Sequence, residues 1–155
     1  MSYLYLDSSA LVKRYLTETG SAWVISLTDP TVGNTIVIAE ITRVEVAAAL
    51  ASRHRMPNGI SQIERERLFR LLIQHTIDEY ETVPINAGVI DHAMRLTQRY
   101  RLRGYDAVQL AAALDSHATA LAAGLPGLTM VSADNDLVAA ALAEGFTADN
   151  PHAHP

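Results

Sequence analysis

Four acidic side chains stand where the chain leaves a short apolar run or enters a helical pattern, and carboxylates in such positions can bind metal ions. Asp7 directly follows the apolar run 3–6, and Asp134 comes shortly after the apolar run 128–131. Ligands of open α/β sheets bind in the crevice outside the carboxyl ends of the strands. We therefore expect the acids to line such a crevice. The four candidates are Asp7, Glu45, Asp106 and Asp134.

Helix capping is the competing explanation for each acid. Thr42 and Glu45 have the spacing of a capping box, in which a hydroxyl and an acid satisfy free backbone N–H groups at a helix start. Asp7, Asp106 and Asp134 each precede a helical pattern and suit the N-cap position. Capping is the commoner role for any one such acid, so only a joint arrangement of all of them favours a functional site.

Short, mostly apolar runs alternate with helical patterns along the chain. This alternation is typical of βαβ units and a largely parallel sheet. Pro84 cannot donate a hydrogen bond to a neighbouring strand, so its strand is expected at an edge of the sheet. A long amphipathic helix is expected over 60–80. The predicted strands are 3–6, 35–39, 83–85, 128–131 and a short last strand that begins at Phe146.

The order of these strands determines whether the acids meet. If the chain winds outward from the first strand to the edge and then returns on the other side, the fourth predicted strand lies beside the first. Asp7 and Asp134 then flank the crevice at a topological switch point. Glu45 and Asp106 lie near helix starts and can lean into the same space.

A bound cation would resolve the repulsion between carboxylates gathered in one crevice, because few lysines lie nearby in the sequence. The chain contains no cysteine, and no histidine neighbours the acids. Hard oxygen ligands of this kind select Mg²⁺ or Mn²⁺ over Zn²⁺. Such a site suits metal-assisted cleavage of a phosphodiester bond.

Composition limits the class of protein. At 155 residues and 49% hydrophobic, the chain suits a single domain over 1–150, with a flexible tail over 151–155. No apolar run approaches the ~20 residues that a membrane span needs. The absence of cysteine and of a signal-like N-terminus indicates the cytoplasm.

The net charge of -5 argues against a surface that coats nucleic acid along its whole length. It does not exclude a nucleic-acid enzyme whose acids lie in a pocket with a local basic rim. Two arginine clusters are candidate rims, and solvated helix ends are the alternative for each. They are Arg53 with Arg55, and Arg99 with Arg101 and Arg103.

The helical pattern after Asp106 is unusually rich in alanine. Small side chains let neighbouring elements approach closely. This pattern indicates either tight packing against the sheet or the face of a homodimer, and a homodimer is predicted.

Together these residues resemble a known family, the PIN domain, and specifically the VapC-type toxins. The resemblance covers nearly the whole chain. Each motif alone is weak, but their order in a chain of this length is fairly specific. The matching segments are Leu6-Asp7-Ser8-Ser9-Ala10-Leu11, Thr42-Arg43-Val44-Glu45-Val46-Ala47, Arg103-Gly104-Tyr105-Asp106-Ala107-Val108-Gln109-Leu110-Ala111 and Val131-Ser132-Ala133-Asp134.

The resemblance implies an α/β/α sandwich, a metal-dependent endoribonuclease that binds Mg²⁺ or Mn²⁺, and a small VapB-type antitoxin as partner. It implies that Asp7 and Asp106 are the principal metal ligands, completed by the other two acids. Ser9 matches a hydroxyl residue that often supports the first acid, although a plain helix-start serine explains it equally well. The family often has Thr where this chain has Ser132, and Asp136 is a second candidate for the last acid.

Two rival functions come from other classes. A phosphoacceptor receiver domain would need paired acids after its first strand and an acceptor Asp after its third, whereas this chain has Asp7-Ser8 and Asn86 at those places. A phosphatase with an Asp-x-Asp nucleophile fails because Ser9 stands two residues after Asp7. A noncatalytic PIN-like module that binds RNA or protein remains the alternative.

Overall fold

The computed structural model describes residues 1–155 and contains one five-stranded parallel sheet. The strand order is β3-β2-β1-β4-β5, so β1 is central and the chain crosses over it between β3 and β4. The predicted switch point between the first and fourth strands is confirmed. The strands are β1 (Tyr3–Leu6), β2 (Thr35–Ala39), β3 (Tyr80–Val83), β4 (Leu128–Val131) and β5 (Ala148–Asp149).

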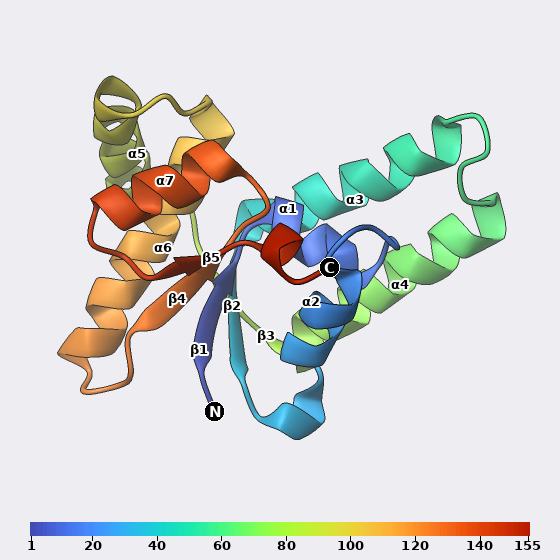
Figure 1. Ribbon diagram of the computed structural model, residues 1–155, viewed down its shortest axis with the longest axis horizontal. Helices are drawn as coiled ribbons and strands as arrows, with labels where there is room; N and C mark the ends of the chain where they lie inside the picture. The colour runs from blue at the N-terminus through green and yellow to red at the C-terminus, as the bar shows by residue number, and fades with distance from the viewer.

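Helices cover both faces of the sheet, as Figure 1 shows, and the predicted α/β/α sandwich is confirmed. One layer is formed by α1 (Ser8–Leu11), α2 (Ser21–Leu27), α3 (Glu40–Arg55) and α4 (Gln62–Asp78), and the other by α5 (Ala87–Arg99), α6 (Gly104–Ala122) and α7 (Asn135–Ala143). No helix is long and apolar enough to cross a membrane. Short 3₁₀ helices η1, η2 and η3 span Val12–Arg14, Pro30–Val32 and Pro151–Ala153.

The central strand β1 separates two apolar cores. Successive strand residues point to opposite faces, so Leu4 and Leu6 pack under α1–α4, whereas Tyr5 packs under α5–α7. Ala111, Ala112 and Ala113 of α6 are buried in the second core. The central alanines of α6 therefore serve close packing against the sheet.

The third strand lies earlier than the predicted 83–85, because it begins immediately after α4 with the buried Tyr80. Its next residues, Glu81 and Thr82, are polar, which hid the strand from a search for apolar runs. Pro84 follows the strand at the sheet edge, as its missing N–H predicted.

The last strand begins at Ala148 and not at Phe146. Gly145 has a φ of 78° and ends α7, and the Phe146 N–H donates to the Ala141 carbonyl at 3.0 Å. This pattern is a Schellman C-cap, which places the Phe146 side chain in the core instead of in a strand.

The end of the chain differs from the predicted flexible tail, because it packs against the domain. Pro151 is buried, and it lies so close to Gly20 that a Cβ there would clash with the Pro151 carbonyl oxygen. The His154 ring stacks on Trp23 at 4.0 Å and its Nε2 lies 3.0 Å from the Asp149 carboxylate. These contacts outweigh the fraying that a polar terminus suggests.

Candidate active site

Asp7 and Asp134 follow neighbouring strands, as predicted from the strand order. In the register of β1 and β4, Leu6 pairs with Val131, and the Asp7 N–H donates to the Val131 carbonyl at 3.2 Å. The Asp7 side chain enters the protein there, since the residue is only 3% exposed.

Three donors hold the Asp7 carboxylate. Oδ1 accepts from the Ala10 N–H at 2.9 Å, so Asp7 does cap α1. The Ser9 hydroxyl lies 2.8 Å from the same oxygen, and the Ser132 hydroxyl donates to Oδ2 at 2.9 Å. Ser9 therefore contacts the acid instead of capping the helix, and Ser132 supplies the hydroxyl that a threonine would supply. Capping and a fixed orientation coexist at Asp7.

Burial raises the pKa of Asp7 from 3.8 to about 6. The hydrogen bonds from Ala10, Ser9 and Ser132 oppose this rise, and the charge of Glu45 adds to it. The site thus contains a well-ordered carboxylate with no positive partner.

Glu45 lies inside α3 and not at its start. The helix begins at Glu40 after the N-cap Ala39, so the alternative explanation of Glu45 as part of a capping box is wrong. Glu45 is half-buried, and Oε2 accepts from Nε2 of Gln109 at 2.7 Å. Burial raises its pKa, which the charge of Asp106 reinforces.

Asp106 is the third residue of α6, and Arg103 holds the N-cap position, so Asp106 is not the predicted cap. Nε of Arg103 donates to Oδ2 of Asp106 at 3.0 Å. Nη2 of Arg103 lies 3.7 Å from Oδ2 of Asp134. One exposed guanidinium therefore bridges two of the predicted ligands, and these carboxylates raise the pKa of Arg103.

Asp134 caps α7 by accepting from the Leu137 N–H at 3.0 Å, as its sequence position predicted. Its own N–H donates to the Ser132 hydroxyl at 3.1 Å, and this hydroxyl in turn donates to Asp7. Asp136 is exposed on the first turn of the same helix. The Asp134 carboxylate shares Arg103 with Asp106, and Asp136 has no such contact, which favours Asp134 over Asp136 as the fourth acid.

A polar opening of about 470 Å³ lies over the outer acids. It holds Arg101 and Arg103 of the predicted basic rim, whereas Arg99 pairs with Glu144 at 3.0 Å. Arg53 pairs with Glu18 on another part of the molecule. The opening is lined by Thr97, Tyr100, Arg101, Leu102, Arg103, Asp106, Asp134 and Asp136.

The predicted ligands do not form a finished coordination shell. Asp7 and Glu45 interact electrostatically, Glu45 also feels the charge of Asp106, and Asp106 and Asp134 share Arg103. No three acidic or histidine side chains converge closely enough to hold an ion in this arrangement. The donor chemistry nevertheless fits a hard divalent cation, because all four donors are carboxylates. Asp7 has no positive partner, and Glu45 feels the charge of Arg103 without forming an ion pair with it.

Gln109 and the bridging role of Arg103 were not predicted from the sequence. Gln109 is a lone amide within an alanine-rich helix. A polar residue on an otherwise apolar helix face is expected to have hydrogen-bond partners, and this pattern could have identified it. Arg103 was assigned only to a basic rim, although it stands three residues before Asp106, a spacing at which helical side chains meet.

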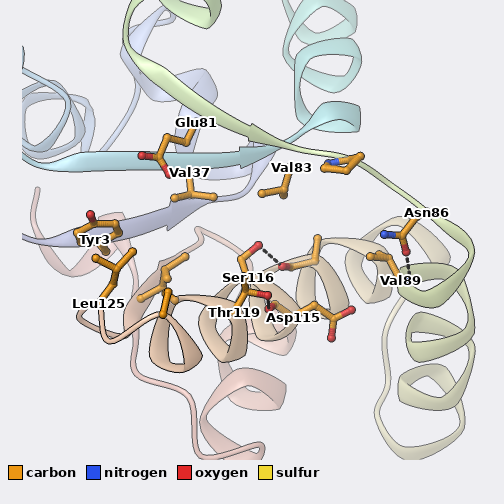
Figure 2. Close-up of a pocket in the computed structure, with 15 residues that line it drawn as sticks. Tyr3, Val37, Glu81, Val83, Asn86, Val89, Asp115, Ser116, Thr119 and Leu125 are labelled. Carbon is orange, nitrogen blue, oxygen red and sulfur yellow. Dashed lines mark hydrogen bonds between the residues drawn. The ribbon is translucent and has the colours of Figure 1, made fainter.

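A separate groove of about 380 Å³ runs between α6 and the β2–β3 side of the sheet, shown in Figure 2. Its walls are mainly apolar, and several of its polar side chains already form hydrogen bonds. Ser116 donates to the Ala112 carbonyl at 2.7 Å, and Asn86 accepts from the Val89 N–H at 3.0 Å. The groove offers shape but no group poised for chemistry.

Comparison with known proteins agrees with this geometry. The PIN domain family model matches residues 4–143. Ribonucleases VapC45 and VapC49 from two strains of Mycobacterium tuberculosis are each 32% identical over 148 residues, which is 94% of this chain and 93% of theirs.

Solved structures share the fold at low identity. The chain of a structure of FitAB bound to an IR36 DNA fragment matches with a TM-score of 0.64 and 16% identity, covering 96% of this chain and 95% of that one. A toxin-antitoxin complex from Klebsiella pneumoniae matches with a TM-score of 0.55 and 18% identity, covering 88% and 90%. The chain belongs to the PIN domain family, in the group that contains the VapC ribonucleases.

Proposed function

We propose that this protein is a metal-dependent endoribonuclease and the toxin of a toxin–antitoxin pair. The observation that carries the proposal is the buried Asp7 carboxylate, fixed by Ser9, Ser132 and the Ala10 N–H beside Glu45. Capping alone does not require an acid here, because Ser or Asn would cap the helix without burying a charge. A buried carboxylate with no ion-pair partner costs free energy. The names of the VapC relatives as ribonucleases support RNA as the substrate.

The residues divide the work of the site. Asp7, Glu45, Asp106 and Asp134 would hold Mg²⁺ or Mn²⁺, with some contacts made through water. A bound cation of this kind supplies an activated water and neutralises charge on the phosphate. Arg103 faces the same opening, where its guanidinium can pair with a phosphate oxygen of the RNA.

We also propose a small antitoxin of the VapB type as partner, because a structural neighbour is a toxin-antitoxin complex. The cytoplasm, where RNA and antitoxin meet, is the proposed compartment. A homodimer is proposed through an exposed apolar patch between α5 and α6, in which Ile90, Met94 and Tyr105 are 41%, 63% and 63% exposed. Patches of this kind on a polar surface are common at interfaces.

Cleavage of RNA by the purified protein tests the proposed activity. We expect cleavage in Mn²⁺ that EDTA stops and that Asp7→Asn abolishes while the circular dichroism spectrum is retained. Asp91→Asn is the matched control, because Asp91 is an exposed acid on α5. Equal cleavage by wild type and Asp7→Asn would show that the activity does not come from this site.

Co-expression tests the proposed partner. The short chain encoded beside this one should form a complex with the protein and relieve its toxicity. A neighbour that does neither would overturn the toxin–antitoxin assignment and leave the nuclease assignment standing.

A further inference from the structure

Gln109 is a buried side chain with a polar contact on every side. It lies on α6, is 2% exposed and is surrounded in sequence by apolar residues. Nε2 donates to Oε2 of Glu45 at 2.7 Å and to Oγ1 of Thr42 at 2.9 Å. Oε1 accepts from the Tyr5 hydroxyl at 2.8 Å. Both N–H groups and the carbonyl oxygen of the amide are thus in use.

These contacts join the elements that carry the inner acids and Asp106. Tyr5 lies on β1, two residues before Asp7, and both Thr42 and Glu45 lie on α3. Gln109 itself lies one helical turn after Asp106 on α6. The amide therefore contacts one candidate ligand, Glu45, directly and connects the three elements that carry Asp7, Glu45 and Asp106.

The orientation of the amide is fixed. If the amide were flipped, Oε1 would face the Glu45 carboxylate, and two acceptors would repel each other. The Tyr5 hydroxyl, which can donate or accept, adapts to this orientation and donates to Oε1. Glu45 consequently has a donor at a set position, even though the residue is only half-buried.

We propose that Gln109 is a positioning residue that holds the Glu45 carboxylate in the geometry for metal binding, with Tyr5 and Thr42 fixing the amide. This role rests on the proposed function of the acids as a metal site. Side chains that orient metal ligands in this way typically change metal affinity about 10- to 100-fold when they are replaced.

Binding of Mn²⁺ alone, measured by isothermal titration calorimetry, tests the proposal. Gln109→Met keeps the approximate shape without the donors, and we expect the dissociation constant to rise about tenfold or more. Leu110→Val is the control, because Leu110 is a fully buried neighbour on the same helix with only apolar contacts. It should lower the thermal midpoint without changing the Mn²⁺ affinity.

Tyr5→Phe is a milder variant that tests the proposal even if Gln109→Met does not fold. It removes one hydroxyl from the network, and we expect a smaller rise in the dissociation constant. Unchanged Mn²⁺ affinity in the folded variants, or equal weakening by Leu110→Val, would overturn the positioning role.

Metal-free crystal structures separate this proposal from the proposed function. Glu45 should be ordered in the wild type and should occupy several rotamers in Gln109→Met, whatever the metal does. An ordered and unmoved Glu45 in the variant would overturn the positioning role. Glu45 could also be disordered in the variant while the wild type fails to bind Mn²⁺. That result would overturn both the metal site and the role of Gln109 in metal binding.

Discussion

The two halves of the acidic site are held in different ways. The inner acids, Asp7 and Glu45, are oriented by neutral donors: hydroxyls, an amide and a backbone N–H. The outer acids, Asp106 and Asp134, share the guanidinium of Arg103, whose side chain is 82% exposed. The inner acids form no ion pair, although the charge of Arg103 reaches Glu45, whereas the outer acids have a counter-charge on an exposed side chain.

The inner carboxylates are fixed in position, whereas the outer carboxylates have their charge balanced. Neutral donors fix the inner carboxylates but leave the repulsion between them, which a cation can relieve. Arg103 relieves the repulsion between the outer carboxylates before any ion arrives. We expect an incoming cation to take over the outer acids and free Arg103 for the substrate phosphate, as an exposed ion pair is weak.

The largest expected effect is on the pH dependence of stability in the metal-free protein. The pKa of Asp7 in the folded protein is about 6, above its ordinary value of 3.8. Between these values the folded state binds more protons than the unfolded state, so stability falls as pH rises through this range. Ionised Asp7 should cost about 3 kcal/mol at neutral pH.

Asp7→Asn checks this cost, because Asn can still accept the capping hydrogen bond from Ala10. Urea unfolding measures the free energy of unfolding of both proteins. As the pH rises from 4 to 7.5, Asp7→Asn should become more stable relative to the wild type. A constant difference across this range would show that Asp7 is not an uncompensated charge. Asp91→Asn should show no such trend.

The next effect contrasts the two pairs in Mn²⁺ affinity. We expect Asp7→Asn to weaken Mn²⁺ binding by about 100-fold or more and Asp134→Asn by about tenfold. These values lie at the upper and lower ends of the losses seen when groups that orient metal ligands are replaced. Both substitutions keep a good helix cap, so folding should be intact. Titration calorimetry measures both constants.

Asp136→Asn completes that series. Asp136 is exposed and Asp134 is linked to Asp7 through Ser132, so the effect should be confined to Asp134. If Asp136→Asn weakened Mn²⁺ binding more than Asp134→Asn did, Asp136 would be the fourth ligand instead. A larger loss at Asp134 than at Asp7 would reverse the inner and outer roles.

The parts of this site that the sequence predicted depend on local patterns. The apolar runs before Asp7 and Asp134, together with a crossover after the edge strand, were enough to place these two acids after neighbouring strands. Their capping roles were also readable, since a cap involves only neighbouring residues. The capping box at Thr42 failed because α3 starts two residues earlier, directly from the end of β2.

The contacts between distant segments were not predictable in the same way. Gln109 meets Tyr5 and Glu45, which lie 104 and 64 residues away in the chain. No local periodicity encodes which buried amide reaches which acid, because the packing of three elements determines it. The polar third strand was misplaced for a related reason, since only its pairing with β2 identifies it.

The smallest expected effect concerns the counter-charge of the outer pair. Arg103→Gln should raise Mn²⁺ affinity slightly, because the guanidinium no longer competes for Asp106 and Asp134, and it should raise KM for RNA about two- to fivefold, the scale of an exposed ion pair. Steady-state cleavage at saturating Mn²⁺ and calorimetry measure the two effects separately. Arg53→Gln, which removes an arginine paired elsewhere with Glu18, should change neither. If Arg103→Gln weakened Mn²⁺ binding instead, the guanidinium would be ordering the outer acids, and the two halves of the site would be held in the same way after all.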